Sequence, residues 1–364
     1  MEHTLSYNDV LLQYEKYQDT ARKILNPSCR VCKVCNGIAC AGRFTNVLEF
    51  GSKGNNLGFI NAYKALADIR IELDVIHEDY IPDTSVEFFG HNFDLPVFAS
   101  PIGKILTAYE YESPYFNNND AYADALVKGA YRAGGMTWLG DNKAEGYFSG
   151  QVAPIKEVNG VGVPTIKPWA DREEFNKRLK WSLDVGAMAI ATDLDAIGLG
   201  YQYSGKVGSR NEGVCTRDVK ELKDLVQSVP VPVVIKGIMS VKAAEKAAET
   251  GAYAILISNH GGNVVEGSMA PCDVVEDIAR AVGKDIKVFA DGGVRSGEDV
   301  FKMLALGAEA VGIGRPYVVS VYGGGEDGAN IYTQKVFWEL QNIMRLANCK
   351  SLKDITRDKV IVRN

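Results

Sequence analysis

The fold of this chain is decided by two glycine turns, Ala290-Asp291-Gly292-Gly293-Val294-Arg295 and Gly312-Ile313-Gly314-Arg315-Pro316. Each turn follows a short apolar run, Ile286–Ala290 in the first case and Ala310–Ile313 in the second. The stretch between the turns, Ser296–Gly307, has helical spacing. This order of elements is typical of consecutive βα units in a parallel barrel, where the loops after the seventh and eighth strands bind phosphate. Two tight turns without a ligand would show the same pattern, so whether these turns bind phosphate depends on the rest of the chain.

Short apolar runs recur at barrel spacing from Leu95 onward, and segments with helical periodicity, such as Val241–Thr250 and Glu298–Leu306, separate most of them. Parallel strands that are buried on both faces read as continuous apolar runs. The sequence therefore predicts an α/β fold, a TIM (β/α)8 barrel over residues 95–364, with an N-terminal helical and cysteine-rich extension over residues 1–94 that packs on it. The predicted strands are Pro96–Ala99, Gly135–Trp138, Val163–Ile166, Met188–Ala191, Val233–Ile235, Ala254–Ile257, Ile286–Ala290 and Ala310–Ile313.

Sequence patterns also predict the local structure of the N-terminal extension and of one barrel loop. Helical spacing predicts helices over residues 1–28 and over Phe59–Ile69, and Thr84–Phe89 reads as the first strand of a small hairpin. The stretch Gly198–Val214 is rich in Gly, Ser, Tyr and Asn and lacks periodicity. It is either a mobile lid over the barrel or a disordered surface loop.

Composition limits the classes of function. The net charge of −6 and the absence of a basic run argue against a nucleic-acid partner. The start, Met1–Asp9, does not read as a secretion signal, and no apolar run reaches the ~18–20 residues of a membrane span. Seven cysteines without such a signal indicate a reducing compartment, which we expect to be the cytoplasm. They favour metal binding or catalysis over disulfides.

Polar residues follow the predicted strand ends, where the active sites of such barrels lie. Several ionisable groups on one rim are costly without a ligand, so we predict an active site there. His260 suits a general base, Asp193 could orient it, and Lys236 could stabilise negative charge or form a Schiff base. The polar residues at the strand ends are Lys167, Asp193 with Asp195 beside it, Lys236, Ser258-Asn259-His260, Asp291 and Gly314-Arg315.

From about residue 230 onward the chain resembles the FMN-dependent α-hydroxy acid oxidase/dehydrogenase family, which includes glycolate oxidase and lactate oxidase. The likeness is looser over Leu95–Gly103 and Met188–Gly198. The motifs that carry it are Val234-Ile235-Lys236-Gly237, Ser258-Asn259-His260-Gly261-Gly262, Asp291-Gly292-Gly293-Val294-Arg295-Ser296-Gly297, Leu304-Ala305-Leu306-Gly307-Ala308, Gly312-Ile313-Gly314-Arg315-Pro316 and the tail Cys349–Ile355.

The resemblance implies an FMN-dependent oxidoreductase acting on a small hydroxylated substrate, a 2-hydroxy acid or a related compound. His260 would take the hydroxyl proton with Asp193 as its partner, while hydride passes to flavin N5 and Lys236 lies near the flavin N1–C2=O edge. It also implies a homotetramer, with O2 or an electron-acceptor protein as the acceptor. The cofactor-binding residues it implies are Ser100, Pro101, Ile102, Gly140, Lys236, Ser258, Asp291, Gly292, Gly293, Arg295, Gly314 and Arg315.

The chain departs from the family pattern at three positions, and all three bear on substrate binding. Asn263 stands where the family has an arginine that grips the substrate carboxylate, Lys167 stands in place of an active-site tyrosine, and the tyrosine of the N-terminal helix is missing. The predicted substrate-binding residues are Lys167, His260 and Asn263. Lys167 would take over the carboxylate, or the substrate is not a simple 2-hydroxy acid. Two alternatives remain open: an FMN-dependent isomerase of the type-2 isopentenyl diphosphate isomerase kind, and a catalytically idle flavin-binding or electron-transfer module.

Four cysteines occupy the N-terminal extension as Cys29-x2-Cys32-x2-Cys35-x4-Cys40. This spacing is compatible with zinc or an iron–sulfur cluster. A cluster near the flavin would give electrons an exit to a partner protein. A redox-active or substrate-binding cysteine pair and a loop of reduced, structural cysteines are the other interpretations.

Overall fold

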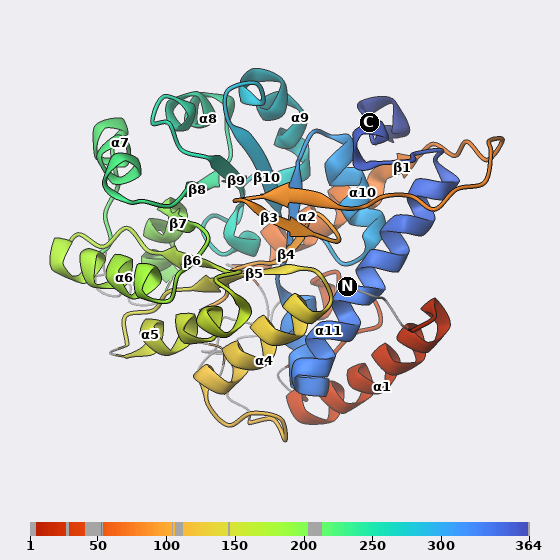
Figure 1. Cartoon of the computed structure of the whole chain (residues 1–364), viewed down its shortest axis with the longest axis horizontal. Helices are drawn as coiled ribbons and strands as arrows, with labels where there is room; N and C mark the ends of the chain where they lie inside the picture. Colours follow the sequence, from red (N-terminus) through yellow and green to blue (C-terminus); the bar gives the residue numbers. More distant parts are fainter. Residues whose placement is uncertain are drawn as a thin grey trace.

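The computed structural model describes residues 5–26, 29–40, 52, 54–103, 105, 112–144, 146–202 and 213–362. Eight parallel strands close into a barrel in the order β10-β11-β4-β5-β6-β7-β8-β9, which confirms the predicted TIM barrel (Figure 1). The barrel strands are β4 (Val97–Ala99), β5 (Met136–Gly140), β6 (Val163–Ile166), β7 (Ile190–Asp193), β8 (Val233–Ile238), β9 (Ala254–Ile257), β10 (Lys287–Asp291) and β11 (Ala310–Ile313).

Helices surround the barrel and fill the connections between its strands. Several begin with side-chain caps, as at Ser240 and Ser296, whose hydroxyls accept backbone N–H groups of the first turn. The outer helices are α4 (Asn119–Arg132), α5 (Tyr147–Val152), α6 (Arg172–Asp184), α7 (Val219–Ser228), α8 (Val241–Ala248), α9 (Pro271–Val282), α10 (Gly297–Ala305) and α11 (Arg315–Leu346), with short 3-10 turns η2 (Ala153–Val158), η3 (Leu194–Gln202), η4 (His260–Gly262), η5 (Leu352–Asp354) and η6 (Arg357–Lys359).

Aromatic side chains fill the barrel and close one of its ends. Inside, the rings of Phe98 and Trp138 stack with centroids 4.6 Å apart. The hairpin of β2 (Val86–Phe88) and β3 (His91–Phe93) covers this end, because Phe88 packs edge-on against Phe289 of β10 at 5.0 Å. The backbone N–H of Phe89 also donates to the hydroxyl of Tyr253, just before β9. The hairpin thus closes the end where the strands begin and leaves their carboxyl ends for the site.

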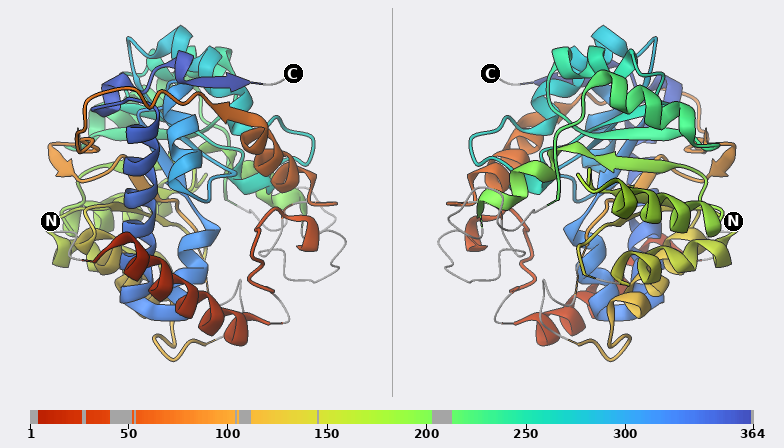
Figure 2. Two further views of the ribbon diagram at one scale, coloured as in Figure 1. Left: turned by 90° about the vertical axis from the view of Figure 1, so that its right-hand side faces the viewer. Right: turned by 90° about the vertical axis from the view of Figure 1, so that its left-hand side faces the viewer.

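The N-terminal extension wraps around the barrel. Helix α1 (Tyr7–Leu25) lies along α11, and β1 (Ile69–Ile71) pairs with the C-terminal strand β12 (Val360–Val362). Helix α2 (Leu57–Asp68) packs on η4, on the opposite side of the barrel from the hairpin (Figure 2). The 3-10 turn η1 (Ile38–Cys40) precedes it. The division at residue 94 stays a prediction.

The sequence interpretation was accurate for the strands and less so for their ends. The predicted bounds match β6, β9 and β11, whereas β7 begins two residues later than predicted and ends on Asp193 itself. Lys236 lies within β8, not after it. The predicted lid, Gly198–Val214, falls largely outside the described residues.

Candidate active site

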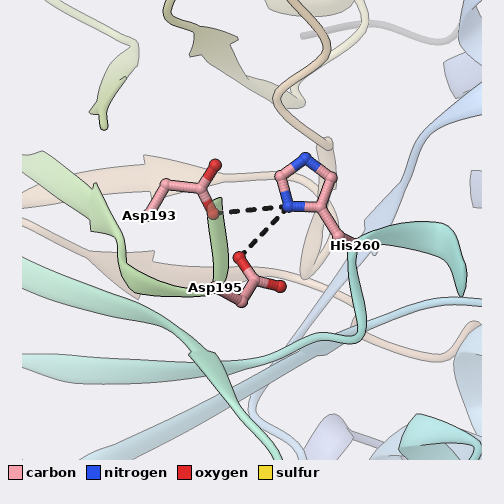
Figure 3. A group of neighbouring side chains, drawn as sticks. All are labelled: Asp193, Asp195 and His260. Carbon is pink, nitrogen blue, oxygen red and sulfur yellow. Dashed lines mark hydrogen bonds and ion pairs between the residues drawn. The ribbon is translucent and has the colours of Figure 1, made fainter. Parts of the chain in front are cut away.

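Four ionisable side chains meet at the carboxyl ends of β7, β8 and β9. Lys236 Nζ lies 2.7 Å from Asp193 Oδ1, 3.3 Å from Asp195 Oδ1 and 3.2 Å from His260 Nδ1. His260 Nδ1 lies 3.1 Å from Asp195 Oδ1 and 3.6 Å from Asp193 Oδ1 (Figure 3). The structure therefore brings the predicted base, its predicted partner and the predicted cation together, and it adds Asp195.

The backbone of the His260 turn places the imidazole. His260 has φ +57°, a conformation that residues other than glycine adopt rarely and that is more frequent at active sites. The Ser258 hydroxyl accepts the His260 backbone N–H at 3.1 Å, and Asn263 Nδ2 donates to the His260 carbonyl at 2.9 Å. Asn263, predicted to contact substrate, thus turns its amide back onto its own loop.

Electrostatics keep Lys236 and Asp193 charged. Burial alone would lower the pKa of Lys236, but the carboxylates of Asp193, Asp195 and Asp291 outweigh it and raise that pKa. Burial would likewise raise the pKa of Asp193, yet Lys236 and the His260 imidazole hold it well below its ordinary value. Lys236 stays protonated, so the Schiff-base alternative, which requires a neutral amine, has no support.

The same geometry leaves little room for a metal ion. Among the described residues, Asp193, Asp195 and His260 are the only set of three potential ligands whose atoms lie within 4.8 Å of one another. The Lys236 ammonium lies within 3.3 Å of all three side chains. A fixed cation therefore already occupies the position that a metal would need.

Lys167 lies on the same rim, at the end of β6. Its Nζ is 3.9 Å from Asp193 Oδ2, and the side chain is 15% exposed. Its backbone N–H donates to the buried Asp141 carboxylate, which also binds the Arg178 guanidinium at 2.8 Å and the Trp169 indole N–H at 2.6 Å. This network, which the sequence interpretation missed, fixes the backbone that carries Lys167.

The two glycine turns carry features that fit a phosphate monoester. The Arg295 and Arg315 guanidinium carbons lie 5.0 and 4.1 Å from the ring centroid of Phe59, so two cations gather at one ring. Arg295 Nη2 is buried without a hydrogen-bond partner among the described residues. Gly314 precedes α11 without a side-chain cap, so the positive end of the helix dipole lies at this turn, where an anion is favoured.

Asp291 adds a carboxylate that can accept hydrogen bonds from a ligand's hydroxyl groups. Ser100 Oγ donates to Asp291 Oδ2 at 3.2 Å, whereas Asp291 Oδ1 is buried without a partner in the described part of the chain. A hydroxylated chain ending in a phosphate would satisfy both Asp291 and Arg295, so these residues fit FMN. Gly140 has a packing reason of its own, because a Cβ there would lie 2.5 Å from the Gly103 nitrogen. The absence of a Cβ at Gly140 therefore lets β5 approach the Pro101–Ile102 segment closely.

The four cysteines line one cavity of about 790 Å³, together with Arg295 and Arg315. No three of their sulfur atoms lie within 4.8 Å of one another in the described structure, so no metal site is assembled there. Burial raises the pKa of Cys29 to about 11, although the Val31 N–H that donates to its sulfur opposes this. A neutral thiol is a poor nucleophile, so Cys29 does not support the thiol-chemistry interpretation. Because no three of the sulfur atoms in the described residues lie close together, the zinc or iron–sulfur prediction is without structural support.

Comparisons with known proteins agree with the motifs. Residues 204–362 match the model of the FMN-dependent dehydrogenase family. A peroxisomal (S)-2-hydroxyacid oxidase of Arabidopsis thaliana is 40% identical over 148 residues, which cover 41% of this chain and 40% of that protein. An L-lactate oxidase of Lactobacillus jensenii is 28% identical over 305 residues, which cover 75% of this chain and 70% of the relative. The chain spans less than half the length of the first of these relatives.

Solved structures confirm the fold over 96% of the chain. A protein of Pediococcus acidilactici described as a lactate oxidase superposes with a TM-score of 0.76 at 23% identity, covering 96% of this chain and 94% of that one. A mandelate oxidase gives a TM-score of 0.75 at 22% identity, covering 96% and 98%. The resemblance predicted from the motifs is therefore confirmed. Lys236, His260 and both glycine turns lie inside the matched segment, whereas Lys167, Asp193 and Asp195 lie outside it.

Proposed function

We propose that this chain, whose C-terminal part matches the FMN-dependent dehydrogenase family, is an FMN-dependent oxidoreductase that oxidises a small hydroxylated substrate, a 2-hydroxy acid or a related compound. The observation that carries the proposal is the contact of His260 with two carboxylates and the buried Lys236 ammonium at the carboxyl ends of neighbouring strands. The family match and the 2-hydroxyacid oxidase relatives support it, and none of these findings favours the isomerase alternative.

The residues proposed to hold the cofactor are those of the two glycine turns and of the strand ends beside them. Arg295, Arg315 and the N-terminal end of α11 at Gly314 would bind the phosphate, and Asp291 would accept from the ribityl hydroxyls. Pro101, Ile102 and Gly140 would line the flavin side, together with the neighbouring Ser100 and Ser258. When bound, FMN supplies the acceptor for the hydrogen and the electron pair of the substrate α-carbon.

The chain's own residues handle the proton and the charge. His260 Nε2 takes the proton of the substrate hydroxyl, and the resulting imidazolium is stabilised by the carboxylates at its Nδ1. Lys236 is a permanent, pre-positioned cation, so it stabilises negative charge that develops beside it without reorganisation of solvent. Water is kept from Lys236, which is only 2% exposed, and the field of its ammonium is therefore strong.

Lys167 is the proposed carboxylate-binding group. Asn263 is engaged by the carbonyl of His260, and an amide could not replace a guanidinium in any case. Lys167 is held on the rim by its neighbours and lies 3.9 Å from Asp193 Oδ2, so its ammonium can reach a substrate near His260. One ammonium binds a carboxylate as a point charge, without the bidentate geometry of an arginine.

The experiment uses purified protein reconstituted with FMN and kept anaerobic. We expect that at least one compound in a panel of 2-hydroxy acids, hydroxy thioesters and amino alcohols bleaches the flavin absorbance. His260→Ala should retain bound FMN and lose the bleaching, because the hydroxyl proton then has no acceptor. If no compound reduces the flavin, or if His260→Ala is reduced at the wild-type rate, the proposal fails.

Other parts of the expectation stay predictions. They are the acceptor (O2 or an electron-acceptor protein), the homotetramer and the cytoplasmic location. None of the helices in the described residues is long and apolar enough to cross a membrane.

A further inference from the structure

We infer that Asp195 is the positioning residue of the site: it accepts the hydrogen of His260 Nδ1 and thereby keeps Nε2 bare for the substrate. The inference rests on the proposed function for the role of His260 as the base. It differs from the expectation from the family resemblance, which assigned this task to Asp193.

Distances separate the two carboxylates. His260 Nδ1 lies 3.1 Å from Asp195 Oδ1, within hydrogen-bond range, and 3.6 Å from Asp193 Oδ1, beyond it. Asp193 has other partners, because its Oδ1 lies 2.7 Å from Lys236 Nζ and its Oδ2 lies 3.9 Å from Lys167 Nζ. Two lysines thus compensate the charge of Asp193, and Asp195 is the carboxylate closer to the imidazole.

Lys236 makes the presence of Asp195 necessary. Its ammonium lies 3.2 Å from the same Nδ1, and an ammonium can only donate hydrogen bonds. If Lys236 were the dominant neighbour, Nδ1 would be bare and the ring hydrogen would lie on Nε2, which could then not take the proton of the substrate hydroxyl. Asp195 reverses this preference, because a carboxylate can only accept. The two neighbours therefore favour opposite tautomers of His260.

The fold makes room for Asp195 at one specific point. Gly237, directly after Lys236 in β8, has φ +97°, and a Cβ on it would lie 2.7 Å from Asp195 Cβ. A side chain at position 237 would displace Asp195 from the imidazole. Asp195 Oδ2 is buried without a hydrogen-bond partner among the described residues, so the carboxylate is held at this site at a cost in desolvation.

Other charges around His260 do not replace Asp195. Asp291 of β10 is close enough for the imidazole to influence its pKa, which burial nonetheless raises. Arg315 of α11 donates to the Gly261 carbonyl at 3.0 Å and is a cation, as are Lys167 and Lys236. A cation offers no acceptor to Nδ1. Among these neighbours only Asp195 has an oxygen atom within hydrogen-bond range of Nδ1.

The test measures the tautomer directly, by 15N NMR of protein labelled in its histidines, at a pH where the imidazole is neutral. The chain has four histidines, so the signals of His260 are those lost in His260→Gln. We expect the hydrogen on Nδ1 in the wild type and on Nε2 in Asp195→Ala. Asp193→Asn should keep it on Nδ1. Asp277→Ala, which removes an exposed carboxylate on α9, is the control for net charge and should change nothing.

Kinetics supply the second readout. Asp195→Ala should slow anaerobic flavin reduction by about 10²- to 10⁴-fold with FMN still bound, which is the range for a misoriented or wrongly protonated histidine. A wild-type hydrogen on Nε2, or an unchanged tautomer in Asp195→Ala, would overturn the inference. If Asp195→Ala does not fold, the isosteric Asp195→Asn replaces it and should enlarge the share of the Nε2–H form. The NMR result is independent of substrate, so it remains valid even if no compound reduces the flavin.

Discussion

The two sides of the barrel rim differ in how their residues are specified. On the β8–β11 side, which carries Lys236, His260 and the glycine turns, contiguous motifs that match a known family specify the residues. On the β6–β7 side, Lys167 and Asp195 lie outside the matched segment and are held by contacts with distant residues. The residues proposed for the cofactor and the base are therefore encoded in local motifs, whereas those proposed for substrate recognition and tautomer control depend on the tertiary structure.

The largest effect is expected from removing the Lys236 ammonium, the cation at the centre of the site. Lys236→Met should slow anaerobic flavin reduction by about 10³-fold, a loss typical of removing a preorganised charge. It should also destabilise the fold by about 3–5 kcal/mol, because Asp193 then keeps a buried charge without its main partner. Stopped-flow reduction and urea unfolding measure the two effects. A variant with wild-type reduction rate and stability would contradict the role of Lys236.

A smaller effect is expected on the substrate side. Lys167→Ala should raise KM for an acidic substrate by about 10- to 100-fold and change kcat little, since a charge-assisted hydrogen bond contributes about 1.5–3 kcal/mol. Lys167→Arg should restore most of the affinity. Lys180→Ala, which removes an exposed lysine paired with Asp184 on α6, is the matched control. If Lys167→Ala leaves KM unchanged for every reducing substrate, another group binds the carboxylate.

The smallest effect is expected at the cysteines. No three of the sulfur atoms in the described residues lie within 4.8 Å of one another, so we expect Cys32→Ser to leave the flavin spectrum and reduction rate unchanged. Metal analysis of protein isolated without oxygen distinguishes a metal centre at the four cysteines from reduced cysteines without a metal. Stoichiometric iron or zinc that disappears in Cys32→Ser would establish the metal centre predicted from the spacing and would require a rearrangement of residues 29–40.

Strand positions were predictable because burial on both faces leaves a continuous apolar signal, as in Val163–Ile166 and Ala254–Ile257. The candidate base and cation were predictable for the same reason, since each follows or interrupts such a run. Asp195 was noticed only as a neighbour of Asp193, because its place beside His260 depends on the absence of a side chain at Gly237 in the next strand. The Asp141–Arg178 pair was missed because its partners lie 37 residues apart and neither belongs to a local motif.

Binding of FMN tests the central claim most directly, because every proposed role depends on it. Purified protein, stripped of any flavin and then mixed with FMN, should turn yellow, quench the flavin fluorescence and gain thermal stability in proportion to occupancy. Arg295→Leu should weaken this binding, because it removes a guanidinium expected at the phosphate. Protein that is folded but colourless, and that neither quenches FMN nor gains stability in its presence, would contradict the account.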